Sequence, residues 1–156
     1  MSGASVTIAS APWPRPRAVR GIWTYIVAWV AAAGAFAGLD AIWLISTNAT
    51  LYRPILAPIL LNGVRPVPAV LFYIVYLTGT VIIAVRPGLK SGRWTTATLM
   101  GATFGFFAYA TYDLTNQATL AVWATKITVI DLCWGTFLTA TGATVGYLAG
   151  SRVKRA

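Results

Sequence analysis

The sequence predicts an all-α integral membrane protein, a four-helix transmembrane bundle, and three observations support this. Of the 156 residues, 58% are hydrophobic and only 10% are charged, against about 45–50% and 25% in an ordinary soluble domain. Twelve Lys or Arg residues stand against three acidic residues, which gives a net charge of +9. Four long stretches are almost free of charge. A water-exposed surface of this size needs many more charges, of both signs, to remain soluble.

The four apolar stretches are each long enough to cross a bilayer as a helix, which takes about 20 residues. They are residues 22–45, 67–85, 94–112 and 127–150. Their charged residues are Asp40 and Asp131 alone. We therefore expect one membrane domain that covers residues 22–150.

The connections between these stretches differ in length. Residues 86–93 are short and polar and contain Pro87-Gly88, which predicts a tight turn between antiparallel helices. Residues 46–66 include an apolar piece at 55–61 that is too short to span and is broken by proline, which indicates an interfacial or re-entrant segment. Residues 113–126 predict a third loop.

The two ends of the chain are predicted to be basic tails. Residues 1–21 are rich in proline and small residues, which is typical of disorder, and residues 151–156 form the second tail. A secretory signal peptide is the alternative at the start, because Ala35-Phe36-Ala37 resembles a cleavage site. The apolar stretch continues to Ile45, however, which favours a retained spanning helix.

The distribution of charge predicts the orientation of the chain. Basic residues favour the cytoplasmic ends of short loops, and with the N-terminus inside, nine cations and no acid lie in cytoplasmic segments. We expect both termini in the cytoplasm and contacts with anionic lipid headgroups there. The sequence contains no basic groove with interleaved aromatic residues, which is the feature that would indicate nucleic-acid binding, so we expect no nucleic-acid partner. The nine cations are Arg15, Arg17, Arg20, Arg86, Lys90, Arg93, Arg152, Lys154 and Arg155.

Glycines recur at a spacing of four residues in three of the four stretches. In lipid, such glycines let helix backbones approach each other closely. We expect packing inside the bundle, and the alternative is a homodimer or larger membrane assembly. The helix-packing candidates are Gly34, Gly38, Gly101, Gly105, Gly135, Gly142 and Gly146.

The three acidic residues, Asp40, Asp113 and Asp131, fall near the same predicted membrane surface. Helical spacing allows all three to point into the bundle, and acidic residues within a membrane usually find partners and mark function. Polar and aromatic neighbours complete an outward-facing polar pocket. Beside the aspartates, its candidates are Trp43, Tyr73, Tyr76, Tyr109, Tyr112, Asn116 and Trp134.

Two accounts of the aspartates stay open. In the structural account they pair with Arg53, Arg65 and Lys126, or accept hydrogen bonds from Tyr and Trp. In the functional account at least two carboxylates lie close together and bind a cation or perform acid–base chemistry. The chain has no His and one Cys, which excludes histidine-ligated metals, multi-cysteine sites and Ser-His or Cys-His dyads, so no metal or cofactor is expected.

The same residues carry a resemblance to a bacterial family known as domain of unknown function 2177. The resemblance extends over residues 20–150 and implies a four-helix inner-membrane protein of unassigned activity, with the aspartate neighbourhood as its hallmark. The matching pieces are Asp40-Ala-Ile-Trp43-Leu, Tyr52-Arg53-Pro54, Pro68-Ala69 with Phe72-Tyr73-x-x-Tyr76, Gly105, Tyr109 to Thr119 and Thr128-x-x-Asp131-x-x-Trp134-Gly135.

These observations favour a non-enzymatic protein of the bacterial inner membrane that binds or transports a small molecule, a cation or part of a lipid in its outer pocket. One alternative is an accessory structural subunit of a membrane assembly. Another is an intramembrane aspartyl hydrolase that uses Asp113 and Asp131, similar to lipoprotein signal peptidase in plan only, because the peptidase motifs are missing. The sequence names no catalytic residue.

Overall fold

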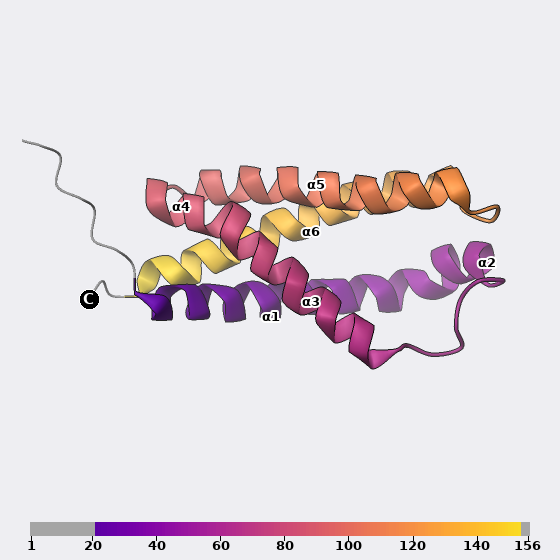
Figure 1. Ribbon diagram of the computed structural model, residues 1–156, viewed down its shortest axis with the longest axis horizontal. Helices are drawn as coiled ribbons and strands as arrows, with labels where there is room; N and C mark the ends of the chain where they lie inside the picture. Colours follow the sequence, from indigo (N-terminus) through magenta and orange to yellow (C-terminus); the bar gives the residue numbers. More distant parts are fainter. Residues whose placement is uncertain (1–20, 154–156) are drawn as a thin grey trace, which may run out of the picture.

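The computed structural model describes residues 21–153, and all regular elements in this range are helices (Figure 1). No strand occurs in this range, so the predicted all-α class is confirmed. Residues 1–20 and 154–156 lie outside the described residues, and with them most of both predicted tails. The first described helix begins at Ile22.

The first helix is longer than predicted. Helix α1 covers Ile22–Thr47, a π-helical turn η1 covers Asn48–Tyr52, and α2 covers Arg53–Leu56. The loop expected from residue 46 therefore begins only after Leu56, and the proposed interfacial piece overlaps α2. Pro54 lies in the first turn of α2, where a missing backbone N–H is tolerated.

The chain reverses within residues 86–93 as predicted, but it does so at Gly92 and not at Pro87-Gly88. Helix α3 (Pro66–Thr80) continues through a π-helical turn η2 (Val81–Val85) into α4 (Arg86–Ser91), and the chain reverses at Gly92, whose φ is 72°. Proline disturbs the helical hydrogen bonds to the preceding turn, and the wider π-turn directly before it accommodates the ring. Gly88 serves close packing, because a Cβ there would lie 2.7 Å from the Cβ of Ala97.

The last two helices, α5 (Trp94–Thr119) and α6 (Thr125–Arg152), are joined by a loop much shorter than predicted. Gln117 ties the two helices together at this loop. Its amide nitrogen donates to the Thr125 hydroxyl over 2.9 Å, and the Thr128 hydroxyl donates to its amide oxygen over 2.7 Å. Asp113 consequently lies inside α5, rather than at the end of a span.

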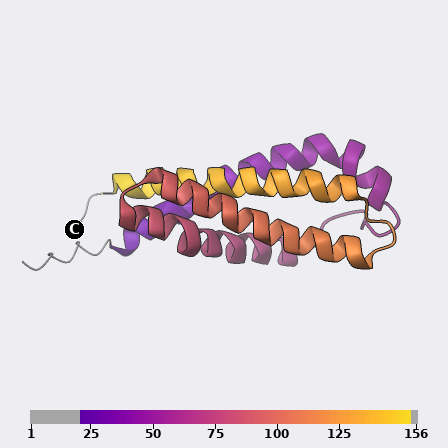
Figure 2. The same cartoon turned by 90° about the horizontal axis from the view of Figure 1, so that it is seen from above.

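The helices alternate in direction along one long axis (Figures 1 and 2). Helix α6 runs beside α5 and also packs against α1, whereas α3 crosses the others obliquely. The start of α1, the α4–α5 connection and the end of α6 share one end of the bundle, which we call the basic end. Helix α2 and the α5–α6 loop share the other, which we call the aspartate end.

Glycines on α5 and α6 allow these two helices to approach closely. A Cβ at Gly105 would lie 2.7 Å from the Cβ of Thr139, and a Cβ at Gly135 would overlap the ring of Tyr109. On the opposite side of α6, a Cβ at Gly146 would lie 3.0 Å from the carbonyl oxygen of Ala28. Gly101 is similarly close to Ala143, and Gly142 is in ordinary contact with Phe36.

We predicted that Gly34 and Gly38 pack inside the bundle, and within a single chain this prediction is wrong. Both are exposed, and a Cβ at either position would meet no atom within 4 Å. They lie on the face of α1 that points away from α6, because the buried face of α1 is formed by Ala28, Ala32 and Phe36.

Two helical runs, Ile22–Leu56 and Pro66–Ser91, are long and apolar enough to cross a membrane by length and composition. Helices α5 and α6 have 26 and 28 residues, which corresponds to about 39 and 42 Å at 1.5 Å per residue. They are less apolar than the first two runs because they contain many Thr and Gly residues.

We expect Gly135→Ala to destabilise the protein, whereas Gly34→Ala should not. The added methyl group at Gly135 has no space beside Tyr109, and overpacking of this kind costs about 1–3 kcal/mol. Alanine at position 34 meets open space and favours the helix. Thermal unfolding of both variants in a mild detergent measures the difference, and equal melting temperatures would contradict the α5–α6 contact.

Candidate functional site

The three aspartates lie at the same level of the bundle, on three different helices. Asp113 on α5 and Asp131 on α6 are each six residues from the helix end at the aspartate end, which is about 9 Å along the axis. Asp40 lies seven residues before α1 passes into η1. All three are buried, with exposed fractions of 9%, 0% and 8%. The sequence-based expectation that they point inward together agrees with this burial.

Asp131 is held by a chain of aromatic hydrogen bonds. The Tyr52 hydroxyl donates to its carboxylate, and the Trp43 indole N–H donates to the Tyr52 hydroxyl over 2.9 Å. Trp43 also stacks on Trp134, with ring centroids 4.4 Å apart and planes inclined by 10°. The continuation of α1 into η1 makes this possible, because it carries Tyr52 to α6.

Asp40 has a tyrosine partner from α3. The Tyr73 hydroxyl donates to its carboxylate over 2.7 Å. One turn further along α3, the hydroxyls of Tyr76 and Thr139 lie 2.7 Å apart, and Thr139 donates to the Gly135 carbonyl over 2.7 Å. These bonds fasten α3 to the other helices at the aspartate end, where it otherwise diverges from them.

Asp113 differs from the other two aspartates because it has no hydrogen-bond partner in the described part of the chain. Both of its carboxylate oxygens are buried, as is the indole nitrogen of Trp134, which also has no partner there. Asp113 is within range of Coulombic repulsion from the carboxylate of Asp131, and Asp131 is within the same range of Asp40. Asp131 therefore couples the three carboxyl groups electrostatically.

Basic side chains do not neutralise this cluster. Within residues 21–153, no ion pair joins an aspartate to Arg53, Arg65 or Lys126. Of the two forms of the structural account, the structure supports tyrosine hydrogen bonds and not salt bridges. The same residues contain no group of three His, Cys, Asp or Glu side chains placed to hold a metal ion.

A pocket of about 400 Å³ lies between α3 and α5 at the aspartate end. Tyr76 and Tyr109 lie edge to face, with ring centroids 6.4 Å apart. The Tyr109 hydroxyl is also within electrostatic range of Asp40 and Asp131, so this residue connects the pocket with the carboxylates. The lining is Phe72, Tyr76, Ala108, Tyr109 and Tyr112, which we call the aromatic pocket.

The structure brings most of the sequence candidates together. Asn116 interacts with Tyr112 on the same helix, and Tyr112 is mostly exposed at the pocket and packs against Trp123. The candidate set missed Tyr52 and Thr139. Tyr52 stood in the Tyr-Arg-Pro piece of the family resemblance, which was the available signal for it. The residues that lie around the carboxylates are Asp40, Trp43, Tyr73, Tyr76, Tyr109, Asp113, Asp131 and Trp134.

Comparison with known proteins identifies one family. Residues 25–148 match the family DUF2177, described as a predicted membrane protein, which confirms the resemblance seen in the sequence. The match includes all three aspartates and the aromatic pocket. No curated protein and no solved structure matches the chain. The family description supports a membrane protein and gives no activity.

We expect Tyr52→Phe to lower stability by about 0.6–1.7 kcal/mol, the scale of side-chain hydrogen bonds inside membrane proteins. Its hydroxyl links Trp43 with Asp131, and its removal leaves the carboxylate without that donor. Tyr25→Phe is the matched control, because no hydrogen bond of the Tyr25 hydroxyl occurs within residues 21–153. A double-mutant cycle with Asp131→Asn, measured by thermal unfolding, isolates the bond, and strictly additive effects would contradict it.

Proposed function

The chain belongs to the DUF2177 family of predicted membrane proteins, and we propose that it spans the bilayer four times and binds a small organic cation in the aromatic pocket. The observation that carries this proposal is the cluster of three buried, electrostatically coupled carboxyl groups that no basic side chain of residues 21–153 neutralises. A bound cation supplies the missing positive charge.

The polarity of α5 and α6 is compatible with membrane crossing. Their threonine hydroxyls donate to backbone carbonyls four residues earlier, as in Thr103 to Leu99 and Thr141 to Phe137. Such internal bonds satisfy the hydroxyls without water. Both helices also exceed the roughly 30 Å thickness of the hydrocarbon core. In our proposal the basic end is cytoplasmic, as the positive-inside rule favours, and the aspartate end lies in the outer half.

The electrostatics of the cluster favour a cationic ligand. Like charges repel strongly in a medium of low dielectric constant, and a buried charge without a partner is costly. Asp113 is fully buried and has no partner in the described residues. A positive group beside Asp131 relieves both costs, because Asp131 interacts electrostatically with Asp113 and with Asp40.

The aromatic lining favours an organic cation rather than a bare metal ion. Ammonium groups bind to the faces of aromatic rings, and aromatic residues form the recognition sites of quaternary ammonium ligands. The pocket presents Phe72, Tyr76, Tyr109 and Tyr112 and falls within the roughly 300–1,000 Å³ range of small-molecule sites. An apolar body fits against these rings while the charged group reaches the carboxylates beside Tyr109.

The position of the pocket suggests entry from the lipid. It lies between α3 and α5, and Phe72 and Tyr112 at its border are exposed on the bundle surface. In a membrane this surface faces acyl chains. We therefore propose a ligand that partitions into the bilayer before it binds.

The hydrolase alternative has less support. An aspartyl hydrolase needs two carboxyl groups open to one water molecule. Asp113 is fully buried, and Asp131 is engaged by Tyr52. Neither carboxyl group is therefore placed as an open, unpartnered group for the activation of water.

We expect the purified protein in dodecyl maltoside to bind tetraphenylphosphonium and not its neutral relative triphenylphosphine oxide. Asp113→Asn and Asp131→Asn should each weaken binding by about tenfold or more, since each removes one carboxyl group from the coupled cluster. Isothermal titration calorimetry measures the affinities.

Arg53→Gln and Lys126→Gln are the matched controls, because they alter charge at the same end without touching the cluster. Unchanged affinity in both Asn variants, or equal binding of the neutral compound, would contradict the proposal. A wild-type protein that does not bind the cation, with Asn variants that unfold at lower temperature, would instead favour the accessory structural subunit.

A further inference from the structure

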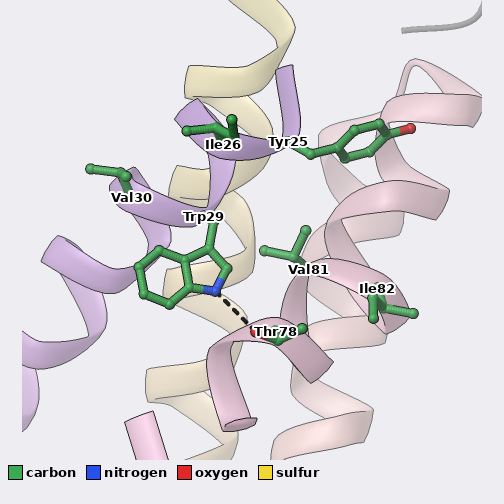
Figure 3. Close-up of a pocket in the computed structure, with 7 residues that line it drawn as sticks. All are labelled: Tyr25, Ile26, Trp29, Val30, Thr78, Val81 and Ile82. Carbon is green, nitrogen blue, oxygen red and sulfur yellow. Dashed lines mark hydrogen bonds between the residues drawn. The ribbon is translucent and has the colours of Figure 1, made fainter. Parts of the chain in front are cut away.

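A second cavity lies at the opposite end of α3, between α3 and the start of α1 (Figure 3). It has a volume of about 310 Å³ and is lined by the first turns of α1 and by the α3–η2 junction. Tyr25 and Trp29 reach across from α1 toward Thr78 and Val81. The lining residues are Tyr25, Ile26, Trp29, Val30, Thr78, Val81 and Ile82, and we call this cavity the basic-end groove.

The walls of the basic-end groove are suited to an apolar chain. The Trp29 indole N–H donates to the Thr78 hydroxyl over 3.2 Å (Figure 3). That hydroxyl in turn donates to the Ile74 carbonyl over 2.7 Å. The polar side-chain atoms of Trp29 and Thr78 are therefore already satisfied within the protein. Ile26, Val30 and Ile82 are exposed, so the groove opens on the outside of the bundle.

The charge at the mouth of the groove is positive. Arg86 begins α4 four residues after Ile82, and residues four apart lie one above the other on a helix face. Both side chains are exposed. Arg93 and Arg152 lie at the same end, and the aspartates of the chain lie near the other end. A ligand in the groove thus meets an arginine where it leaves the hydrocarbon region.

We propose that the basic-end groove binds an anionic phospholipid, with one acyl chain against Trp29 and the phosphate group at Arg86. The apolar walls match the chain and the positive mouth matches the phosphate, whereas a zwitterionic lipid gains less from Arg86. Anionic headgroups are attracted to basic residues beside membrane helices. This site is separate from the aromatic pocket; it rests on the proposed membrane insertion but not on the binding of a cation.

Native mass spectrometry of the purified full chain, titrated with phosphatidylglycerol or phosphatidylcholine, tests the proposal. We expect a preference of about fivefold for phosphatidylglycerol, the factor typical of one basic residue near a headgroup. Arg86→Gln should abolish the preference, and Arg93→Gln at the same end should retain it. Equal binding of the two lipids, or equal effects of the two substitutions, would overturn the proposal.

A second pair of variants tests the groove itself. Ile82→Trp places a large ring in the basic-end groove and should weaken the binding of both lipids. Ile83→Trp adds the same ring on the neighbouring residue, which faces a different cavity beside α5, and should leave lipid binding unchanged. If lipid binding survives Ile82→Trp in a variant whose circular dichroism matches the wild type, the acyl chain does not occupy the groove and the proposal fails.

Discussion

The close contact between α5 and α6 determines much of the remaining structure. Gly105 packs against Thr139, and Gly135 leaves space for the ring of Tyr109, so the two helices approach more closely than larger residues would permit. This approach brings Asp113 and Asp131 within electrostatic range of each other. It also directs Tyr109 toward the carboxylates. The geometry of the site therefore depends on Gly105 and Gly135, which have no functional side chain.

Tyrosines, rather than basic residues, stabilise the carboxylates, and this choice has a physical basis. Burial of an arginine beside an aspartate requires the desolvation of two charges, which offsets much of their attraction. The neutral hydroxyls of Tyr52 and Tyr73 can enter the bundle at a lower cost and still donate to Asp131 and Asp40. The arrangement holds these two carboxylates in place but adds no positive charge. In the proposed function, this absence of a positive charge is what attracts a cation to the site.

The sequence was sufficient to predict the helical class and the inward clustering of Asp40, Asp113 and Asp131, because hydropathy and helical period determine both. It was insufficient where several interactions compete locally. Pro87 signals a turn in isolation, but the π-turn before it lets the helix continue to Ser91. The role of Tyr52 depends on whether α1 continues past Thr47, which the apolar pattern alone does not reveal. Spacing could not show that Gly34 and Gly38 face away from α6, because a glycine pair has the same appearance on either side of a helix.

The oblique course of α3 accounts for openings at both ends of the molecule. Near the basic end, small side chains such as Ala28 and Ala84 pack together, and the helices can lie close. Near the aspartate end, Phe36, Tyr73 and Tyr76 pack in the same interface, and their rings hold α3 away from its neighbours. Because α3 is oblique, it cannot pack closely against both α1 and α5 over its whole length. The aromatic pocket lies where it separates from α5, and the basic-end groove lies where it separates from α1. The aspartates lie near the first opening and Arg86 lies beside the second, so one packing constraint yields the two cavities for which we propose ligands of opposite charge.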